Sequence, residues 1–326
     1  MRRTRFESIG RYTPETKVST RELISRLKLR GLALERLTGV RNRHVYDPHP
    51  DRYESSFVLA QRAMRDCLRH SAYSAADLDI IISASTTRTV GPGTHCAAPA
   101  FALMLATAIG ADRARHFDID NGCAGMLTGV AILDRMIKAG VVRNGMVVAG
   151  EQLTAATESA VRDINSRNDS HLEALTVGDA GIAVIVDDRG DDDDEIHYIE
   201  LMTTPAETHS DEPIQQQAID RLAAVLREGG RNPREESFDF CIYHQSSAPA
   251  ITRLHRLARK TFRGLPTRML NVLADYGNTA STSHFLVLHE YLRQQQIPKG
   301  SRILMIPQTS GIMSGCCAAT VSRLEV

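Results

Sequence analysis

The chain has 326 residues, of which 42% are hydrophobic and 24% charged, and 39 Lys and Arg side chains balance 39 Asp and Glu side chains. This length allows two ordinary domains, or one large domain built from two similar halves. The balanced charge gives no reason to expect a nucleic acid or an anionic membrane as the main partner.

We expect a cytoplasmic protein. No apolar run approaches the roughly 18 residues that a membrane-spanning helix needs, and the first residues, MRRTRFESIG, lack the apolar core of a signal peptide. The six cysteines are scattered, without a CxxC pair or a Cys/His spacing typical of zinc. Most of them should therefore be reduced thiols in packed positions.

Helical and extended patterns alternate along the first half of the chain. A helix over Arg52–His70 leads into a short apolar strand over Leu78–Ala84. A helix, a strand, a helix and a strand are then predicted over Ala97–Ile109, Arg115–Ile119, Gly125–Ala139 and Gly145–Ala149. This alternation favours an α/β layered fold over an all-β fold or a helical bundle.

The second half repeats this rhythm. The predicted strands are Ala180–Val186, Phe238–Tyr243 and Arg302–Ile306, the predicted helices are Ile214–Glu228, Pro249–Thr261 and Ser281–Gln296, and a Gly/Ser turn leads into Cys317–Arg323. Between the halves lies an acidic run that starts at Asp187, DDRGDDDDEIH. Blocks of like charge resist packing, so we expect a solvated loop tip. A calcium site is the alternative, but the EF-hand spacing is absent.

Cys123 is a candidate nucleophile. It lies in the stretch FDIDNGCAGMLT, after a predicted strand and at the start of a predicted helix. Backbone N–H groups there lack intrahelical partners and the helix dipole is positive, which favours a thiolate over a thiol. Gly122, Ala124 and Gly125 leave room for a substrate. A buried structural cysteine is the alternative.

Two further polar residues follow strand or turn patterns in the second half. His244 comes directly after a predicted strand, and the carboxyl ends of strands are where open α/β sheets keep their ligands. Asn278 lies in a Gly-marked turn before a predicted helix. It is a candidate amide donor to a reacting carbonyl, or a helix cap.

Taken together, these residues resemble the Cys-His-Asn triad of the ketoacyl synthase III family of thiolase-fold condensing enzymes. The cysteine motif is matched by Asn121–Gly125, the histidine motif by His244-Gln245, and the asparagine motif by Gly277–Ser281. The likeness runs along the whole chain. It includes Gly10–Pro14, Thr38–His44, Gly178–Gly181 and a C-terminal glycine loop from Thr309 to Gly315.

The resemblance implies a five-layered αβαβα fold of two pseudo-equivalent halves, at residues 1–175 and 176–326, usually assembled as a homodimer. It implies that Cys123 accepts an acyl group from a thioester on coenzyme A or acyl carrier protein. Backbone N–H groups at Cys123, Ser310 and Gly311 would stabilise the oxyanion. His244 and Asn278 would then assist a decarboxylating Claisen condensation with a malonyl-type or β-ketoacyl thioester, without a metal or organic cofactor.

The chain departs from the family pattern in several places. It has no tryptophan to stack on the coenzyme A adenine, and Ala33–Leu37 lacks the arginine that the family has just before the Thr38-Gly39 motif. Ser247 and Pro249 replace an asparagine and an arginine implicated in carrier-protein docking. The loop His95–Pro99 lacks the glutamate of the hydrocarbon-forming branch. We therefore expect a member from secondary metabolism.

Two alternatives to a condensing enzyme remain open. In an acyltransferase, a hydroxyl or amine would capture the acyl group from Cys123, with His244 as general base. A non-catalytic partner subunit would keep the fold for dimerisation, but such partners often lose the cysteine. The complete triad therefore favours an enzyme.

Overall fold

The structure is a computed structural model, and it describes residues 2–26, 33–164, 170–203, 214–266, 268–309 and 313–326. Its first sheet has the strand order β1-β9-β8-β4-β7. These strands are β1 (Arg5–Tyr12), β9 (Ala180–Asp187), β8 (Asn144–Glu151), β4 (Ile80–Ser83) and β7 (Arg115–Asp118). The central strand pairs β4–β7 and β4–β8 are parallel, whereas β9 runs antiparallel to both of its neighbours.

The second sheet has the order β10-β14-β12-β11, with a short strand β13 also paired to β14. These strands are β10 (Glu195–Thr203), β14 (Met313–Val321), β12 (Ser301–Ile306), β11 (Phe240–Tyr243) and β13 (Gln308–Thr309). The strands β11 and β12 are parallel, so His244 and Pro307 both follow strand ends at the same edge of the sheet.

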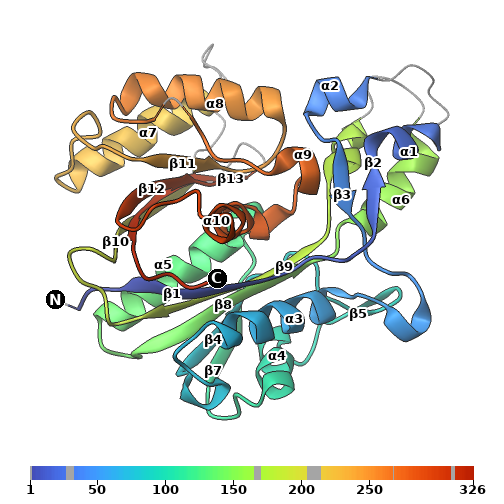
Figure 1. Ribbon diagram of the computed structural model, residues 1–326, viewed down its shortest axis with the longest axis horizontal. Coiled ribbons are helices and arrows are strands. Elements are labelled where there is room, and N and C mark those ends of the chain that lie inside the picture. The colour runs from blue at the N-terminus through green and yellow to red at the C-terminus, as the bar shows by residue number, and fades with distance from the viewer. Residues whose placement is uncertain (1, 27–32, 165–169, 204–213, 267, 310–312) are drawn as a thin grey trace.

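Helices fill the space between the sheets and cover their outer faces (Figure 1). The central layer holds α5 (Gly125–Lys138) and α10 (Ser283–Arg293). The outer layers hold α3 (Ser56–Arg69) with α4 (Phe101–Ile109), and α7 (Ile214–Glu228) with α8 (Ala248–Thr261). Every residue of α10 from Ser283 to Glu290 is buried, as expected of a helix enclosed by two sheets. The predicted five-layered αβαβα fold is therefore confirmed.

Short elements connect these layers. The helices are α1 (Thr20–Ser25), α2 (Leu34–Thr38), α6 (Thr154–Asp163) and α9 (Leu273–Tyr276), and the strands are β2 (Lys17–Ser19), β3 (Asn42–His44), β5 (Thr89–Gly91) and β6 (Thr94–His95). The 3₁₀ segments are η1 (Pro50–Arg52), η2 (Ala75–Asp77), η3 (Gly122–Ala124), η4 (Ser170–Thr176) and η5 (Ala280–Thr282). In the described part of the chain, no helix combines the length and apolar character needed to cross a membrane.

The helix predicted from Ala97 begins four residues later, at Phe101. Pro99 has no N–H group and disfavours helical backbone at the residue before it, so the chain between Ala97 and Ala100 stays outside the helix. The Asp118 carboxylate accepts from the N–H groups of Phe101 and Ala102 at 2.7 and 2.8 Å. It therefore caps the helix where the proline no longer interferes.

The acidic run after Asp187 is only partly the solvated loop tip that its charge predicts. Asp187 and Asp194 are buried and both bind the guanidinium of Arg5, at 3.0 and 3.3 Å. Arg323 binds Asp194 at 3.3 Å and also Asp191. Arginines from distant parts of the chain therefore pack this turn against the first sheet, and its like charges are neutralised in place.

The strand β9 lies beyond the predicted boundary between the halves at residues 175 and 176, yet it pairs within the first sheet. The first sheet therefore includes residues up to Asp187. The division of the chain between residues 175 and 176 stays a prediction. The free edge of β1 is met by the chain near Glu325. The N–H of Ile9 donates to the carbonyl oxygen of Glu325 at 2.9 Å, and Ser8 and Glu325 form a parallel bridge.

Candidate active site

Cys123 lies in the 3₁₀ turn η3, at the junction of β7 and α5. Gly122 adopts a left-handed backbone with φ of 50°, which turns the chain sharply just before the cysteine. Gly125 is needed for a close approach, because a Cβ there would lie 2.9 Å from the carbonyl oxygen of Ala84. The two glycines therefore serve the backbone path that brings Cys123 to the start of α5.

The thiol of Cys123 is not the stabilised thiolate that its place before a helix predicts. Burial, and then the negative charge of Glu151, raise the pKa of Cys123 from 9.0 to about 11, although its own backbone N–H acts in the opposite direction. Loss of solvation therefore outweighs the effect of the local backbone N–H group. All six cysteines are free thiols, as predicted.

Asn278 lies in the turn between α9 and η5. Its backbone N–H donates to Thr176 at 2.9 Å, and its carbonyl oxygen accepts from Gly178 at 3.0 Å. The side-chain Oδ1 accepts from the N–H of Ala280 at 2.9 Å. This hydrogen bond fixes the acceptor end of the amide, and the Nδ2 group is its donor end.

His244 follows β11 and is 9% exposed. Its backbone N–H donates to the carbonyl oxygen of Ile306 at 3.3 Å. The ring Nδ1 atom is buried and has no hydrogen-bond partner among the described residues. Burial, together with the neighbouring His284, lowers the pKa of His244 to about 3, so the imidazole is neutral at physiological pH.

The turns that carry two of the three residues pack together. The turn η3, with Cys123, contacts both η5, which follows Asn278, and β13. His244 is bound to Ile306, two residues before β13. The predicted oxyanion residues Ser310 and Gly311 lie outside the described residues, so their place in the site stays a prediction.

Two buried ionisable residues near these turns have no part in the sequence prediction. Glu151, at the end of β8, is 0% exposed, and its carboxylate accepts hydrogen bonds from Thr86, Thr87 and Ser281. His284, at the start of α10, donates through Nε2 to the carbonyl oxygen of Ile306 at 3.2 Å. In the sequence, Glu151 is marked only by its position as a charged residue at the end of the apolar run VVAGE.

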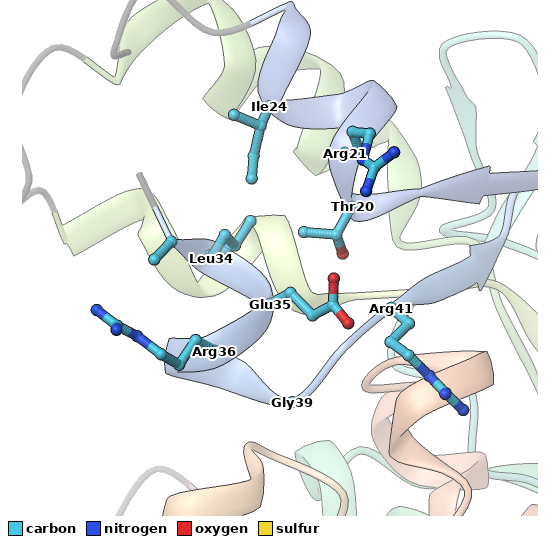
Figure 2. A pocket seen from close by; sticks show the side chains of 9 residues that line it. Thr20, Arg21, Ile24, Leu34, Glu35, Arg36, Gly39 and Arg41 are labelled. Carbon is cyan, nitrogen blue, oxygen red and sulfur yellow. The ribbon is translucent and has the colours of Figure 1, made fainter. Parts of the chain in front are cut away.

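A cavity of about 550 Å³ opens where α1 and α2 meet, around the Thr38-Gly39 motif. Ile24 and Leu34 line its apolar wall (Figure 2). Three arginines also line it, Arg21, Arg36 and Arg41, with Glu35 as the acidic residue. No group of three or more His, Cys, Asp or Glu side chains suited to a metal ion occurs in the described part of the chain.

Two family models match the chain. The model of 3-oxoacyl-[acyl-carrier-protein] synthase III matches residues 117–205, and the model of the C-terminal part of the same enzymes matches residues 231–321. Together they span more than half of the chain, and they include Cys123, His244 and Asn278. The chain belongs to the 3-oxoacyl-[acyl-carrier-protein] synthase III family. It is accordingly a 3-oxoacyl-[acyl-carrier-protein] synthase III-like acyltransferase.

Curated relatives of this synthase III family match nearly the full length. The beta-ketoacyl-[acyl-carrier-protein] synthase III of Acidiphilium cryptum is 27% identical over 338 residues, with 97% of this chain and 98% of the relative covered. The enzyme of the same name from Streptomyces lividans is 25% identical, with 95% and 92% covered. A cerulenin-bound crystal structure of OleA from Xanthomonas campestris is 19% identical, with a TM-score of 0.81 and 98% of both chains covered. This likeness establishes the thiolase-like fold.

Proposed function

We propose that the protein is a ketosynthase that transfers an acyl group from a thioester to Cys123 and condenses it with a malonyl or β-ketoacyl thioester. The observation that carries this proposal is the packing of η3 against η5 and β13. This packing supports a shared site for Cys123 and Asn278, which are 155 residues apart in the sequence. In this proposal Cys123, His244 and Asn278 are the catalytic residues.

In the first step, the sulfur of Cys123 attacks the carbonyl carbon of the acyl thioester. A carbon–sulfur bond forms, the bond to the carrier sulfur breaks, and the proton of Cys123 passes by way of His244 to the departing thiolate. The raised pKa of Cys123 and the lowered pKa of His244 support a reaction that starts from a neutral thiol and a neutral imidazole. Backbone N–H groups at Cys123, Ser310 and Gly311 would hold the oxyanion.

In the second step with a malonyl extender, the carboxylate leaves as carbon dioxide, and the electrons of the broken carbon–carbon bond form an enolate. His244 and Asn278 would donate hydrogen bonds to the oxygen of that enolate. The neutral state of His244 and the hydrogen bond that Oδ1 of Asn278 accepts from Ala280, which orients the amide, support this donor role. The enolate carbon then attacks the acyl group, a carbon–carbon bond forms, and the thiolate of Cys123 leaves and takes up a proton.

The acyl donor that we propose is a thioester on acyl carrier protein or on coenzyme A. The cavity beside the Thr38-Gly39 motif, with Arg21, Arg36 and Arg41, supports an anionic carrier group. The outward face of α8 supports an acidic protein partner, because Arg253, Arg256, Arg259 and Lys260 are all exposed there. We further propose a homodimer, as is usual in the family. We also propose a role in secondary metabolism, since Pro249 and the absence of tryptophan depart from the pattern of the fatty-acid-initiating enzymes.

One experiment tests this function. The protein is incubated with a panel of acyl thioesters on both carriers, and its intact mass is recorded; malonyl thioester is then added, and carbon dioxide and a β-keto product are measured. We expect acylation that Cys123→Ala abolishes, followed by decarboxylation. Acylation without decarboxylation by any extender would overturn condensation and would favour transfer to a hydroxyl or amine. No acylation by any donor would favour a non-catalytic subunit.

A further inference from the structure

Glu151 is a fully buried carboxylate that joins three segments of the chain. Its Oε1 accepts from the N–H of Thr86 at 2.9 Å and from the hydroxyl of Ser281. Its Oε2 accepts from the N–H of Thr87 at 3.0 Å and from the Thr87 hydroxyl at 2.9 Å. Thr86 and Thr87 follow β4 in the first sheet, whereas Ser281 belongs to η5 and precedes α10. The carboxylate therefore crosses from the first sheet to the turn that follows Asn278.

The same contact lies beside the start of α5. A Cβ on Gly125 would meet the carbonyl oxygen of Ala84 at 2.9 Å and the Cβ of Ser281 at 3.7 Å. Gly125 comes two residues after Cys123, and Ser281 comes three residues after Asn278. Through its hydrogen bond with Ser281, Glu151 thus anchors η5. This turn follows Asn278 and contacts η3, which carries Cys123.

We propose that Glu151 is a positioning residue that fixes the Asn278 turn against the Cys123 end of α5. This inference rests on the proposed roles of Cys123 and Asn278. Glu151 is not proposed as a general base, because both of its oxygens are occupied by donors and its exposure is 0%. Removal of one donor leaves a buried carboxylate oxygen short of a partner, which is costly in a low-dielectric interior.

Glu151 also acts on Cys123 through its charge. A negative charge on Glu151 opposes the thiolate and contributes, after burial, to the raised pKa of Cys123. Burial also raises the pKa of Glu151 itself, and the hydrogen bonds from Ser281, Thr86 and Thr87 act in the opposite direction. The other charged groups near η3 are Asp118, which caps α4, and Asp120, which lies 4.0 Å from Arg88. The packed turn η5 contributes hydroxyl side chains, and the neutral rings of His244 and His284 lie at the end of β11 and at the start of α10.

Two variants separate these two effects. Glu151→Gln removes the charge and part of the acceptor set, whereas Ser281→Ala keeps the charge and removes only the contact with η5. The full-length protein is alkylated with iodoacetamide at pH 8 and pH 9, below the raised pKa of Cys123, and the rate at Cys123 is followed by peptide mass. Decarboxylation of malonyl thioester is measured on the acylated protein.

We expect Glu151→Gln to raise the alkylation rate of Cys123 severalfold, because a charge that opposes the thiolate is removed, and Ser281→Ala to leave that rate unchanged. We expect decarboxylation to fall about tenfold or more in both variants, with the rate of Cys123 acylation less affected. Glu7→Gln is the matched control, because Glu7 is also buried and accepts from Ser71 and Ala72, both at 2.8 Å. It should change neither readout.

Wild-type decarboxylation in Ser281→Ala would overturn the positioning role, and this variant retains the test if Glu151→Gln does not fold. An unchanged alkylation rate in folded Glu151→Gln would overturn the electrostatic effect on Cys123. Failure of the proposed function looks different, because the wild-type protein itself would then show no acylation with any donor. The alkylation measurement needs no substrate and still reports whether Glu151 acts on Cys123.

Discussion

The imidazole rings of His244 and His284 lie 6.0 Å apart, centroid to centroid, with their planes 30° from parallel. One carbonyl oxygen, that of Ile306, meets the backbone N–H of His244 at 3.3 Å and the Nε2 of His284 at 3.2 Å. Both rings are buried, and burial lowers the pKa of His284 to about 4 and that of His244 to about 3. Both imidazole rings are therefore uncharged in the folded protein at neutral pH.

This pair makes the protein sensitive to acid. Both histidines have a pKa of 6.5 outside the fold, so between about pH 6.5 and pH 4 the unfolded chain binds more protons than the folded one. Stability therefore falls as pH falls through that window. At pH 5 each histidine contributes a loss of about 2 kcal/mol relative to pH 7.

The variant His284→Leu tests this linkage. It removes one titrating group, so the loss of unfolding free energy between pH 7 and pH 5 should shrink by about 2 kcal/mol, as measured by urea denaturation at each pH. His44 and His197 also have lowered pKa values, so part of the acid sensitivity should remain. An unchanged loss would show that His284 is protonated in the folded protein.

The variant His244→Ala should separate the two steps of the reaction. Cys123 should still accept an acyl group, at a reduced rate, because the sulfur itself is unchanged. Decarboxylation should fall by at least about 10²-fold, since one of two proposed enolate donors is lost. Intact mass follows the first step and released carbon dioxide the second. Condensation at a rate near that of the wild type would exclude the role given to His244.

Gly277→Ala should disturb the turn that carries Asn278. Gly277 has φ of 70°, and a Cβ there would lie 2.4 Å from the carbonyl oxygen of Thr176. Gly300 is a matched control, because its φ is 80° but a Cβ would meet nothing within 4 Å. We expect a loss of about 1 kcal/mol in Gly300→Ala and at least about 3 kcal/mol in Gly277→Ala, by urea denaturation. Equal losses would contradict the close contact with Thr176.

Charge reversal on α8 should separate the two carriers. Arg253→Glu combined with Arg256→Glu should raise KM for an acyl group on carrier protein by about tenfold or more, and should leave KM for the same acyl group on coenzyme A unchanged. The paired measurement controls for damage to the site, because both donors use Cys123. A similar rise for both carriers would place the effect in the site and not on this face of α8.

The regular elements could be predicted where hydrophobic spacing is strong. The helix predicted over Ile214–Glu228 has the same bounds in the structure, and the strand predicted at Arg302–Ile306 differs by one residue. The strand β1 was missed, because in RFESIGRY the buried residues include Glu7 and Ser8 as well as Phe6 and Ile9. Their polar groups are bound by distant parts of the chain, which local spacing cannot reveal.

The site could be predicted only in part. The residue types and their order lead to Cys123, His244 and Asn278, whose roles stay predictions, and their local environment is a property of the packed structure. A helix start alone predicts a thiolate at Cys123, whereas the pKa depends on burial and on Glu151, which is 28 residues away in the sequence. The link between Glu151 and Ser281 spans 130 residues. Such couplings are not local, and no spacing rule contains them.

The contact of Glu325 with β1 also bears on aggregation. An unpaired edge strand offers a row of free N–H and C=O groups on which a strand of another molecule can form. Here the backbone of Glu325 donates to Glu7 at 3.3 Å and accepts from Ile9 at 2.9 Å. This short pairing occupies part of the edge of β1, between Glu7 and Ile9. The backbone of Glu325 therefore blocks the addition of a strand from another molecule at that part of the edge.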